Sequence, residues 1–232
     1  MKKGDIRREK ILETAEKLFF EKGFDHTSVQ DILDELKLSK GGFYHHFPSK
    51  EAVMAEVCER RILSQLEQLQ TQLQADTIRP IGKLNMILAR VNLLECDTAE
   101  FAALMLKTCY LDMDVRVRVQ MQTTIREKLR EPLADVLEAG AADGTFFVRS
   151  CEQTSRIVLR IAADADDEMC RILARDRGGA DTILEITAVL DAARDAIGTL
   201  IGAAHGTVVL FDTGRFLGKY RESVEMLRKL GE

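Results

Sequence analysis

The side chains best suited to bind a charged ligand lie in one short stretch near the N-terminus. No acidic residue occurs from position 36 to position 50. The stretch instead carries cationic, histidine and tyrosine side chains, at Lys37, Lys40, Tyr44, His45, His46 and Lys50. Side chains of these types bind phosphate oxygens and the edges of nucleic-acid bases. The composition of the stretch therefore favours a polyanion as its partner.

A helix-turn-helix would present this stretch to such a partner. Thr27-x-x-Gln30 predicts a capping box at the start of a first short helix. Ser39 is expected to cap a second short helix, and Ser49 to cap a long helix that continues past Leu73. Two short helices joined by a tight turn are a common means of placing one helix in a DNA groove.

The aromatic residues of the second short helix divide between two faces. Phe43 and Phe47 lie four residues apart, so both are expected to face the core. Tyr44, His45 and His46 then point elsewhere. The two adjacent histidines diverge by about 100° around a helix, and no cysteine or acid lies nearby in the sequence. Contact with phosphates or bases is therefore favoured over a metal site.

Helical periodicity extends over the rest of the chain. Residues 5–22 form an amphipathic helix, which Gly23 is expected to end in a left-handed conformation. Residues Val115–Val119 alternate as a strand would, but their helical flanks favour a helix. Further helices are predicted at about 81–96, 100–111, 114–139, 151–177, 181–201 and 213–230.

Composition limits the class of protein. The 232 residues are 46% apolar and 31% charged, with three prolines and no tryptophan, which favours an all-α globular chain. Residues 1–50 contain ten Lys and Arg against nine Asp and Glu, whereas the remainder contains 23 against 29. The net charge of −5 is thus +1 in the first part and −6 in the second. Five scattered cysteines without a secretion signal predict reduced thiols and a cytoplasmic location.

The first fifty residues resemble the DNA-binding domain of the TetR family of bacterial transcriptional regulators. The resemblance rests on the types at Ile11-Leu12, Gly23-Phe24 and Thr27-Ser28-Val29, and above all on the run from Ser39 to Phe47 with Ser49-Lys50-Glu51. It implies an all-α homodimer with a three-helix DNA-binding domain at 1–50 and an effector-binding and dimerisation domain at 51–232. The partners implied are double-stranded operator DNA and a small-molecule effector.

The same resemblance, with the local chemistry, assigns the DNA-binding residues. They are Thr27, Ser28, Ser39, Lys40, Gly41, Gly42, Tyr44, His45, His46 and Lys50. Two positions depart from the family pattern, because Leu33 stands where a small residue is usual and Lys37 where glycine is usual. A left-handed Lys37 would carry a modest steric cost and alter the aim of the next helix. The operator sequence therefore stays open.

Methionine and aromatic residues in the second part suggest an effector pocket. Each one alone is explained by an ordinary core, but as a set they fit an apolar cavity. The candidate ligand-binding residues are Met86, Phe101, Met105, Cys109, Tyr110 and Met121. We therefore expect a mostly hydrophobic or aromatic effector. A nearby acidic cluster, at Asp164, Asp166, Asp167 and Glu168, is read as a solvated face in preference to a cation site.

These features predict a dimeric, ligand-responsive transcriptional repressor that its effector releases from DNA. Dimerisation is expected through apolar stripes after residue 150, which include Ile157, Ile186, Leu190 and Ile197. No phosphate-binding glycine loop, metal-ligand spacing or nucleophile motif occurs, so we expect no enzyme activity, metal or cofactor. Two alternatives remain: a small-molecule-binding enzyme with a DNA-binding-like head, and an architectural protein that binds DNA without sequence preference. Effector, operator and regulated genes stay open.

Overall fold

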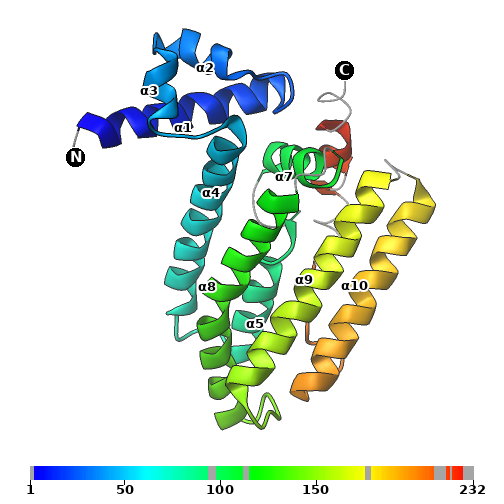
Figure 1. The fold of residues 1–232 in the computed structure, drawn as a ribbon. Coiled ribbons are helices and arrows are strands. Elements are labelled where there is room, and N and C mark those ends of the chain that lie inside the picture. The colour runs from blue at the N-terminus through cyan, green and yellow to red at the C-terminus, as the bar shows by residue number, and fades with distance from the viewer. Residues whose placement is uncertain are drawn as a thin grey trace.

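A computed structural model describes residues 3–93, 98–111, 115–175, 179–211, 218–219 and 221–226. All the elements identified in these residues are helical, which confirms the predicted all-α fold (Figure 1). Their bounds are α1 (Lys3–Lys22), α2 (Val29–Leu36), α3 (Lys40–Tyr44), α4 (Lys50–Leu73), α5 (Pro80–Ala89), α7 (Ala99–Leu106), the π-helical turn η1 (Lys107–Leu111), α8 (Val115–Ala142), α9 (Cys151–Arg175) and α10 (Ala180–Ile201).

Helices α1 to α3 form a head that packs on the start of α4. Phe19 of α1 and Phe43 of α3 are both fully buried, and Phe47 is 2% exposed, so both phenylalanines of the second short helix face the core as predicted. Gly23 ends α1 with φ of 84°, and Lys37 ends α2 in the left-handed region with φ of 51°. Both left-handed positions confirm the prediction. Lys37 is the one non-glycine residue with positive φ among the described residues.

The long helix α4 leads from the head into the body (Figure 1). One face of α4 is buried along its whole length, from Val53 through Ile62 to Leu73. In the body, α4 and α5 pack on α8, α8 packs on α9, and α9 packs on α10. Helix α7 lies beneath the head and contacts α1. The head therefore contacts the body through both α4 and α7.

The body helices agree with most of the predicted ranges. Helix α8 begins at Val115, so the alternating segment is helical, and Pro132 lies inside that helix. The helix predicted at 81–96 is shorter, since α5 ends at Ala89. Most of the helix predicted at 213–230 lies outside the described residues, although residues 218–219 and 221–226 are helical.

The apolar stripes after residue 150 are mostly used inside the subunit. Leu190 is 2% exposed and Ile197 is fully buried, because α10 packs on α9. The exposed apolar side chains on these helices are Ile157 (47%), Leu184 (68%) and Leu200 (37%). Substitution of Leu190 or Ile197 would therefore disturb the subunit core itself. Among the described helices, none is long and apolar enough to cross a membrane.

Candidate nucleic-acid interface and body pocket

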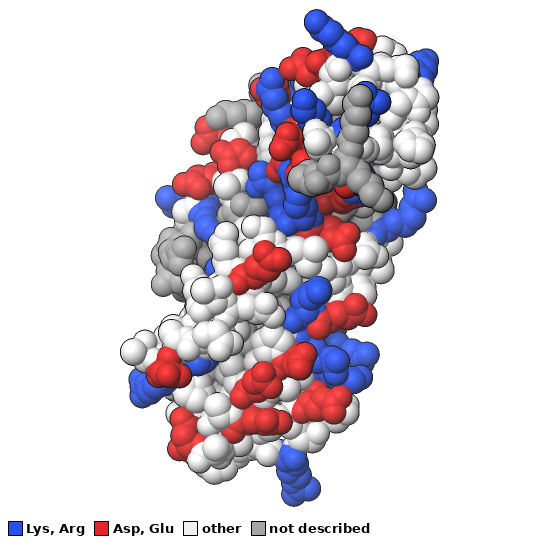
Figure 2. Space-filling model, turned by 90° about the vertical axis from the view of Figure 1, so that its left-hand side faces the viewer, with Lys and Arg blue, Asp and Glu red and all other residues white. Residues whose placement is uncertain are grey.

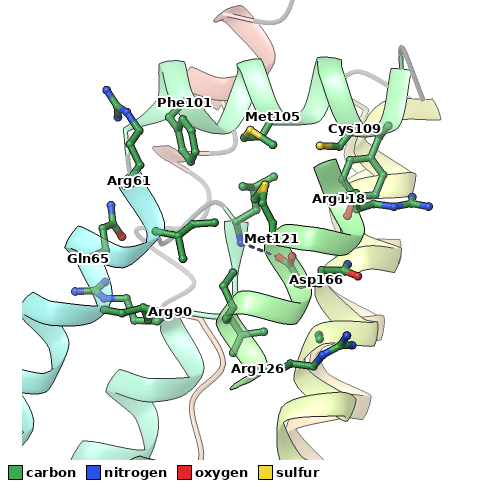
Figure 3. A pocket seen from close by; sticks show the side chains of 18 residues that line it. Arg61, Gln65, Arg90, Phe101, Met105, Cys109, Arg118, Met121, Arg126 and Asp166 are labelled. Carbon is green, nitrogen blue, oxygen red and sulfur yellow. Dashed lines mark hydrogen bonds between the residues drawn. The ribbon is translucent and has the colours of Figure 1, made fainter. Parts of the chain in front are cut away.

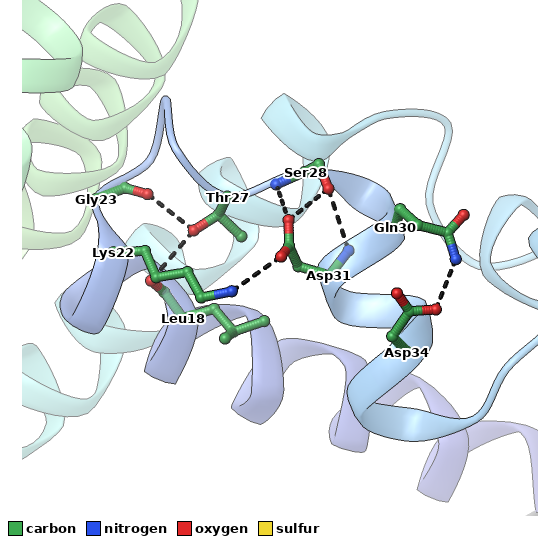
Figure 4. A network of polar contacts seen from close by, with 8 residues as sticks. All are labelled: Leu18, Lys22, Gly23, Thr27, Ser28, Gln30, Asp31 and Asp34. Atoms are coloured by element: carbon green, nitrogen blue, oxygen red, sulfur yellow. Dashed lines mark hydrogen bonds and ion pairs between the residues drawn. The ribbon is translucent and has the colours of Figure 1, made fainter.

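The turn between α1 and α2 has a different cap from the one predicted (Figure 4). Ser28 is the N-cap of α2: its hydroxyl accepts from the Asp31 N–H, and the Asp31 carboxylate accepts from the Ser28 N–H at 2.8 Å. The predicted Thr27–Gln30 box is therefore wrong by one residue. Two candidate cap pairs overlap here, and the fully buried Thr27 uses its hydroxyl elsewhere.

Thr27 locks the turn instead of facing outward. Its hydroxyl lies 2.8 Å from the Gly23 carbonyl oxygen and 3.1 Å from that of Leu18, where it donates to the end of α1. A fully buried side chain cannot reach a phosphate, so the predicted DNA contact by the Thr27 side chain is wrong for this conformation. The neighbouring Ser28 is exposed and keeps its predicted position on the surface.

The Asp31 carboxylate ties the two helices of this turn together. Lys22 at the end of α1 donates to Asp31 over 2.8 Å. Hydrogen bonds from Lys22 and then from Ser28 hold the pKa of Asp31 well below its usual range. The carboxylate is thus ionised at neutral pH, where it fixes the start of α2.

Helix α3 exposes the predicted contact residues. The Ser39 hydroxyl caps the helix and accepts from the Gly42 N–H at 3.2 Å. Lys40, Gly41 and His45 are exposed, and the Tyr44 ring is 54% exposed. A Cβ added at Gly41 would meet nothing within 4 Å. The outer face of α3 is therefore small and polar at its start, which permits close approach of a ligand to the backbone.

Two other predicted contact residues are partly engaged within the head. The Lys50 ammonium donates to the Phe24 carbonyl over 2.7 Å and lies 4.2 Å from the centre of the Phe24 ring. Burial, together with the charges of His45, Arg7 and Arg8, lowers the pKa of His46. His46 is therefore mostly neutral at pH 7. DNA contact by Lys50 and His46 stays a prediction.

Charges of both signs mix on the face of the molecule shown in Figure 2. Acidic and basic side chains are interspersed there along the head and the body. This face therefore lacks a uniformly basic surface.

Ion pairs join the head to α4 on the side of α1. Arg8 pairs with Glu56, and Arg60 pairs with Glu9 and, at 2.5 Å, with Glu16. These contacts fix the angle between the first helix of the head and the helix that enters the body.

Arg61 connects the same surface of the head with the body. Its Nε lies 2.5 Å from a Glu16 carboxylate oxygen. Its guanidinium carbon lies 4.8 Å from the centre of the Phe20 ring on α1 and 5.1 Å from that of Phe101 on α7. Arg61 thus contacts both the head and the wall of the body pocket.

The body encloses a small cavity between α4, α7, η1, α8 and α9 (Figure 3). Its volume is about 40 Å³. Five of the six predicted ligand residues line it: Phe101, Met105, Cys109, Tyr110 and Met121. Met86 on α5 does not line it, because the chain reaches the cavity only just after α5, at Arg90 and Val91. Ligand binding by all six residues stays a prediction.

Sequence reasoning missed the charged part of the lining. Four arginines border the cavity, at Arg61, Arg90, Arg118 and Arg126. On α8, Arg118, Gln122 and Arg126 recur at four-residue spacing beside Met121 and Ile125, so they share the face that lines the cavity. This spacing was visible in the sequence, but it shows only that the residues share a face, not that the face meets a cavity.

The acidic cluster is also partly internal, contrary to the solvated face predicted. Asp166 is only 9% exposed, lines the cavity and accepts from the Leu93 N–H over 2.8 Å. Burial raises its pKa to about 7. Asp167 accepts from the Tyr110 hydroxyl over 2.9 Å and pairs with Arg171 at 2.7 Å. Helix α9 therefore turns two of the acids towards η1 and α8.

Comparison with known proteins identifies relatives of the head and of the whole fold. Residues 11–57 match the family model for bacterial regulatory proteins of the tetR family. The HTH-type transcriptional regulator YuxN of Bacillus subtilis is 61% identical over 44 residues, which cover 19% of this chain and only 15% of that relative.

Longer similarities extend into the body. The HTH-type transcriptional repressor KstR2 of Mycolicibacterium smegmatis is 30% identical over 145 residues, or 60% of this chain and 67% of that protein. A solved TetR-family transcriptional regulator from Pectobacterium atrosepticum has the same fold, with a TM-score of 0.63 and 18% identity. That similarity covers 87% of this chain and 98% of that chain.

Proposed function

This chain belongs to the TetR family of bacterial regulatory proteins, and we propose that it is a homodimeric, cytoplasmic transcriptional repressor that a small molecule releases from operator DNA. The observation that carries the proposal is the outer face of α3. It combines the exposed Lys40, Tyr44 and His45 with an accessible backbone at Gly41, and it lacks acidic groups. The description of the Mycolicibacterium smegmatis relative as a repressor supports the sign of regulation.

In this proposal, residues 1–50 bind DNA, and residues 51–232 bind the effector and form the dimer. Helix α3 enters the major groove, where Lys40 and Tyr44 contact phosphates and base edges. The exposed Ile157, Leu184 and Leu200 on α9 and α10 supply apolar surface for a second subunit. An effector that binds the cavity changes the separation of the two heads, and this lowers their affinity for two half-sites.

Selection of bound DNA from a random pool tests the function directly. A repressor of this kind is expected to enrich one two-fold symmetric sequence. Lys40→Ala should weaken binding to that sequence and reduce the slope of log affinity against log salt by about one if Lys40 contacts a phosphate. Tyr44→Ala should weaken binding without loss of the folded head. Lys83→Ala, on α5 of the body, is the matched control and should leave affinity unchanged.

Two other functions would give different results in the same experiment. An architectural DNA-binding protein would enrich no sequence at any salt concentration. A small-molecule enzyme would turn over a ligand while it failed to select DNA. Unchanged operator affinity in both the Lys40 and Tyr44 variants would overturn the assignment of α3 as the contact helix.

A further inference from the structure

The lining of the body cavity has a charge opposite to that of the body. Residues 51–232 carry 23 basic and 29 acidic side chains, a net charge of −6. The cavity is bordered by four arginines and one acid, Asp166. Positively charged side chains that converge on a cavity favour an anionic ligand, even though the body as a whole is negatively charged.

The four arginines differ in what already neutralises them. Arg61 pairs with Glu16 of the head, and Arg118 lies 3.7 Å from an Asp167 oxygen. Arg90 and Arg126 have no ion-pair partner among the described residues. The Arg90 Nε is buried, and no described residue accepts a hydrogen bond from it. Burying an N–H of a charged guanidinium without a hydrogen-bond acceptor costs free energy. An anion that accepted from this N–H would recover that cost.

The rest of the lining includes the polar Gln65, Tyr110 and Gln122 beside apolar side chains. In Figure 3, Phe101, Met105 and Cys109 line one end of the cavity, and Arg90 and Arg126 lie on opposite sides of the other end, with their guanidinium groups pointing apart. Arginine side chains also extend to solvent from apolar surfaces without binding anything. The buried Nε distinguishes Arg90 from that case, because a side chain extended only to solvent would expose it.

We propose that the effector is an amphipathic carboxylate, with its apolar part against Phe101 and Met105 and its carboxylate against Arg90. Guanidinium groups match the planar geometry of a carboxylate with two parallel hydrogen bonds. This inference rests on the proposed function only in calling the ligand an effector. It adds a negative charge to the mostly hydrophobic or aromatic effector that the sequence predicts.

Two series of matched probes test the class of ligand. The first is octanoate, octan-1-ol and octylamine; the second is 1-naphthoate, 1-naphthalenemethanol and 1-naphthylmethylamine. Dissociation constants are measured by calorimetry on the full chain without DNA. In at least one series, the carboxylate is expected to bind at least about tenfold more tightly than the alcohol and the amine.

Single variants then locate the carboxylate. Arg90→Gln is expected to reduce the preference for carboxylate over alcohol at least about threefold, while alcohol binding is retained. Arg130→Gln is the control for the loss of an arginine, because Arg130 on α8 pairs with Glu152 outside the cavity. Its carboxylate preference should equal that of the wild type. Thermal unfolding of each variant shows whether it is folded.

Several results would overturn the proposal. They are tighter or equal binding of the alcohol or amine in both series, no binding of either carboxylate at millimolar concentration, or a preference that survives in the folded Arg90→Gln variant. If that variant failed to fold, sulfate and acetate would be tested as competitors of the bound carboxylate in the wild type, and no competition by either anion would also overturn the proposal. Failure to select an operator would refute the regulatory function but leave these ligand measurements interpretable.

Discussion

Glu16 offers the sharpest test of how the head is held on the body. Its carboxylate accepts from both Arg60 and Arg61 at 2.5 Å, and its side chain is only 15% exposed. Glu16→Gln keeps the size of the side chain but removes the charge that both arginines share. An exposed ion pair contributes up to about 1 kcal/mol, whereas breaking a buried pair costs about 3–5 kcal/mol. The intermediate exposure of Glu16 and Arg61 gives an expected loss of about 1–2 kcal/mol.

The matched control is Glu56→Gln. Glu56 also joins the head to α4, through Arg8, but it is more exposed and its partner does not line the cavity. Its removal should cost less than about 1 kcal/mol. For a domain of this size, about 1 kcal/mol corresponds to 2–4 °C in the midpoint of thermal unfolding. Glu16→Gln should therefore lower the midpoint by about 2–8 °C, and Glu56→Gln by no more than about 4 °C.

Hydrogen exchange shows where the stability is lost. Amides of α1 and of the Arg61 turn of α4 should exchange faster in Glu16→Gln, because the head opens from α4 more often. Where α10 amides exchange by local opening, their exchange rates should be the same in Glu16→Gln as in the wild type. Equal midpoints for the Glu16 and Glu56 variants, with unchanged exchange in α1, would refute the idea that Arg61 holds the head to the pocket wall.

Three further predictions follow from the packing and the burial of single groups. A Cβ at Gly140 would lie 2.1 Å from a carbon of the buried Phe146 ring. Gly140→Ala should therefore lower the free energy of unfolding by about 1–2 kcal/mol, although alanine adds about 1 kcal/mol of helix propensity. An unchanged or raised midpoint of thermal unfolding would contradict the clash. Burial raises the pKa of Asp166 to about 7, above about 3.9 for an unfolded aspartate, so the native state keeps a proton that the unfolded chain releases. Stability should therefore fall as pH rises from about 4 to about 7, and Asp166→Asn should flatten that slope and raise the midpoint at pH 8; an unaltered slope would exclude Asp166 as its source. Leu184→Glu places a charge on a side chain that is 68% exposed, and sedimentation should show folded monomers if α10 forms the dimer interface; an unchanged dimer would move the interface elsewhere.

The fold was predictable because local signals and long-range packing agree in the head. Phe43 and Phe47 repeat at helical spacing, and Gly23 has the conformation that a helix end requires, so the sequence pattern determines both positions. The cap at Ser28 was misassigned since two overlapping cap patterns start at adjacent residues. Only the packing of Thr27 beneath α1 decides between them.

The pocket was half predictable for a different reason. Methionine and aromatic residues reveal an apolar interior, so Met105 and Met121 were found from composition. Whether an arginine faces a cavity or solvent depends on the neighbouring helix, and no pattern within α5 distinguishes Arg90 in this respect. The buried position of Asp166 likewise depends on Leu93, which is distant in sequence and supplies the backbone donor.

The small size of the cavity has a consequence for the rate of the response. A volume of about 40 Å³ holds little more than a water molecule, whereas sites for drug-sized ligands measure about 300–1,000 Å³. An effector of that size could bind here only if the helices separated before or while it entered, and the free energy of that separation would be deducted from the affinity. Association should consequently be slower than diffusion allows, and its observed rate should level off at high ligand concentration if opening comes first. If an effector acts through this cavity, the chain would respond only to a ligand that is present long enough to meet the open form.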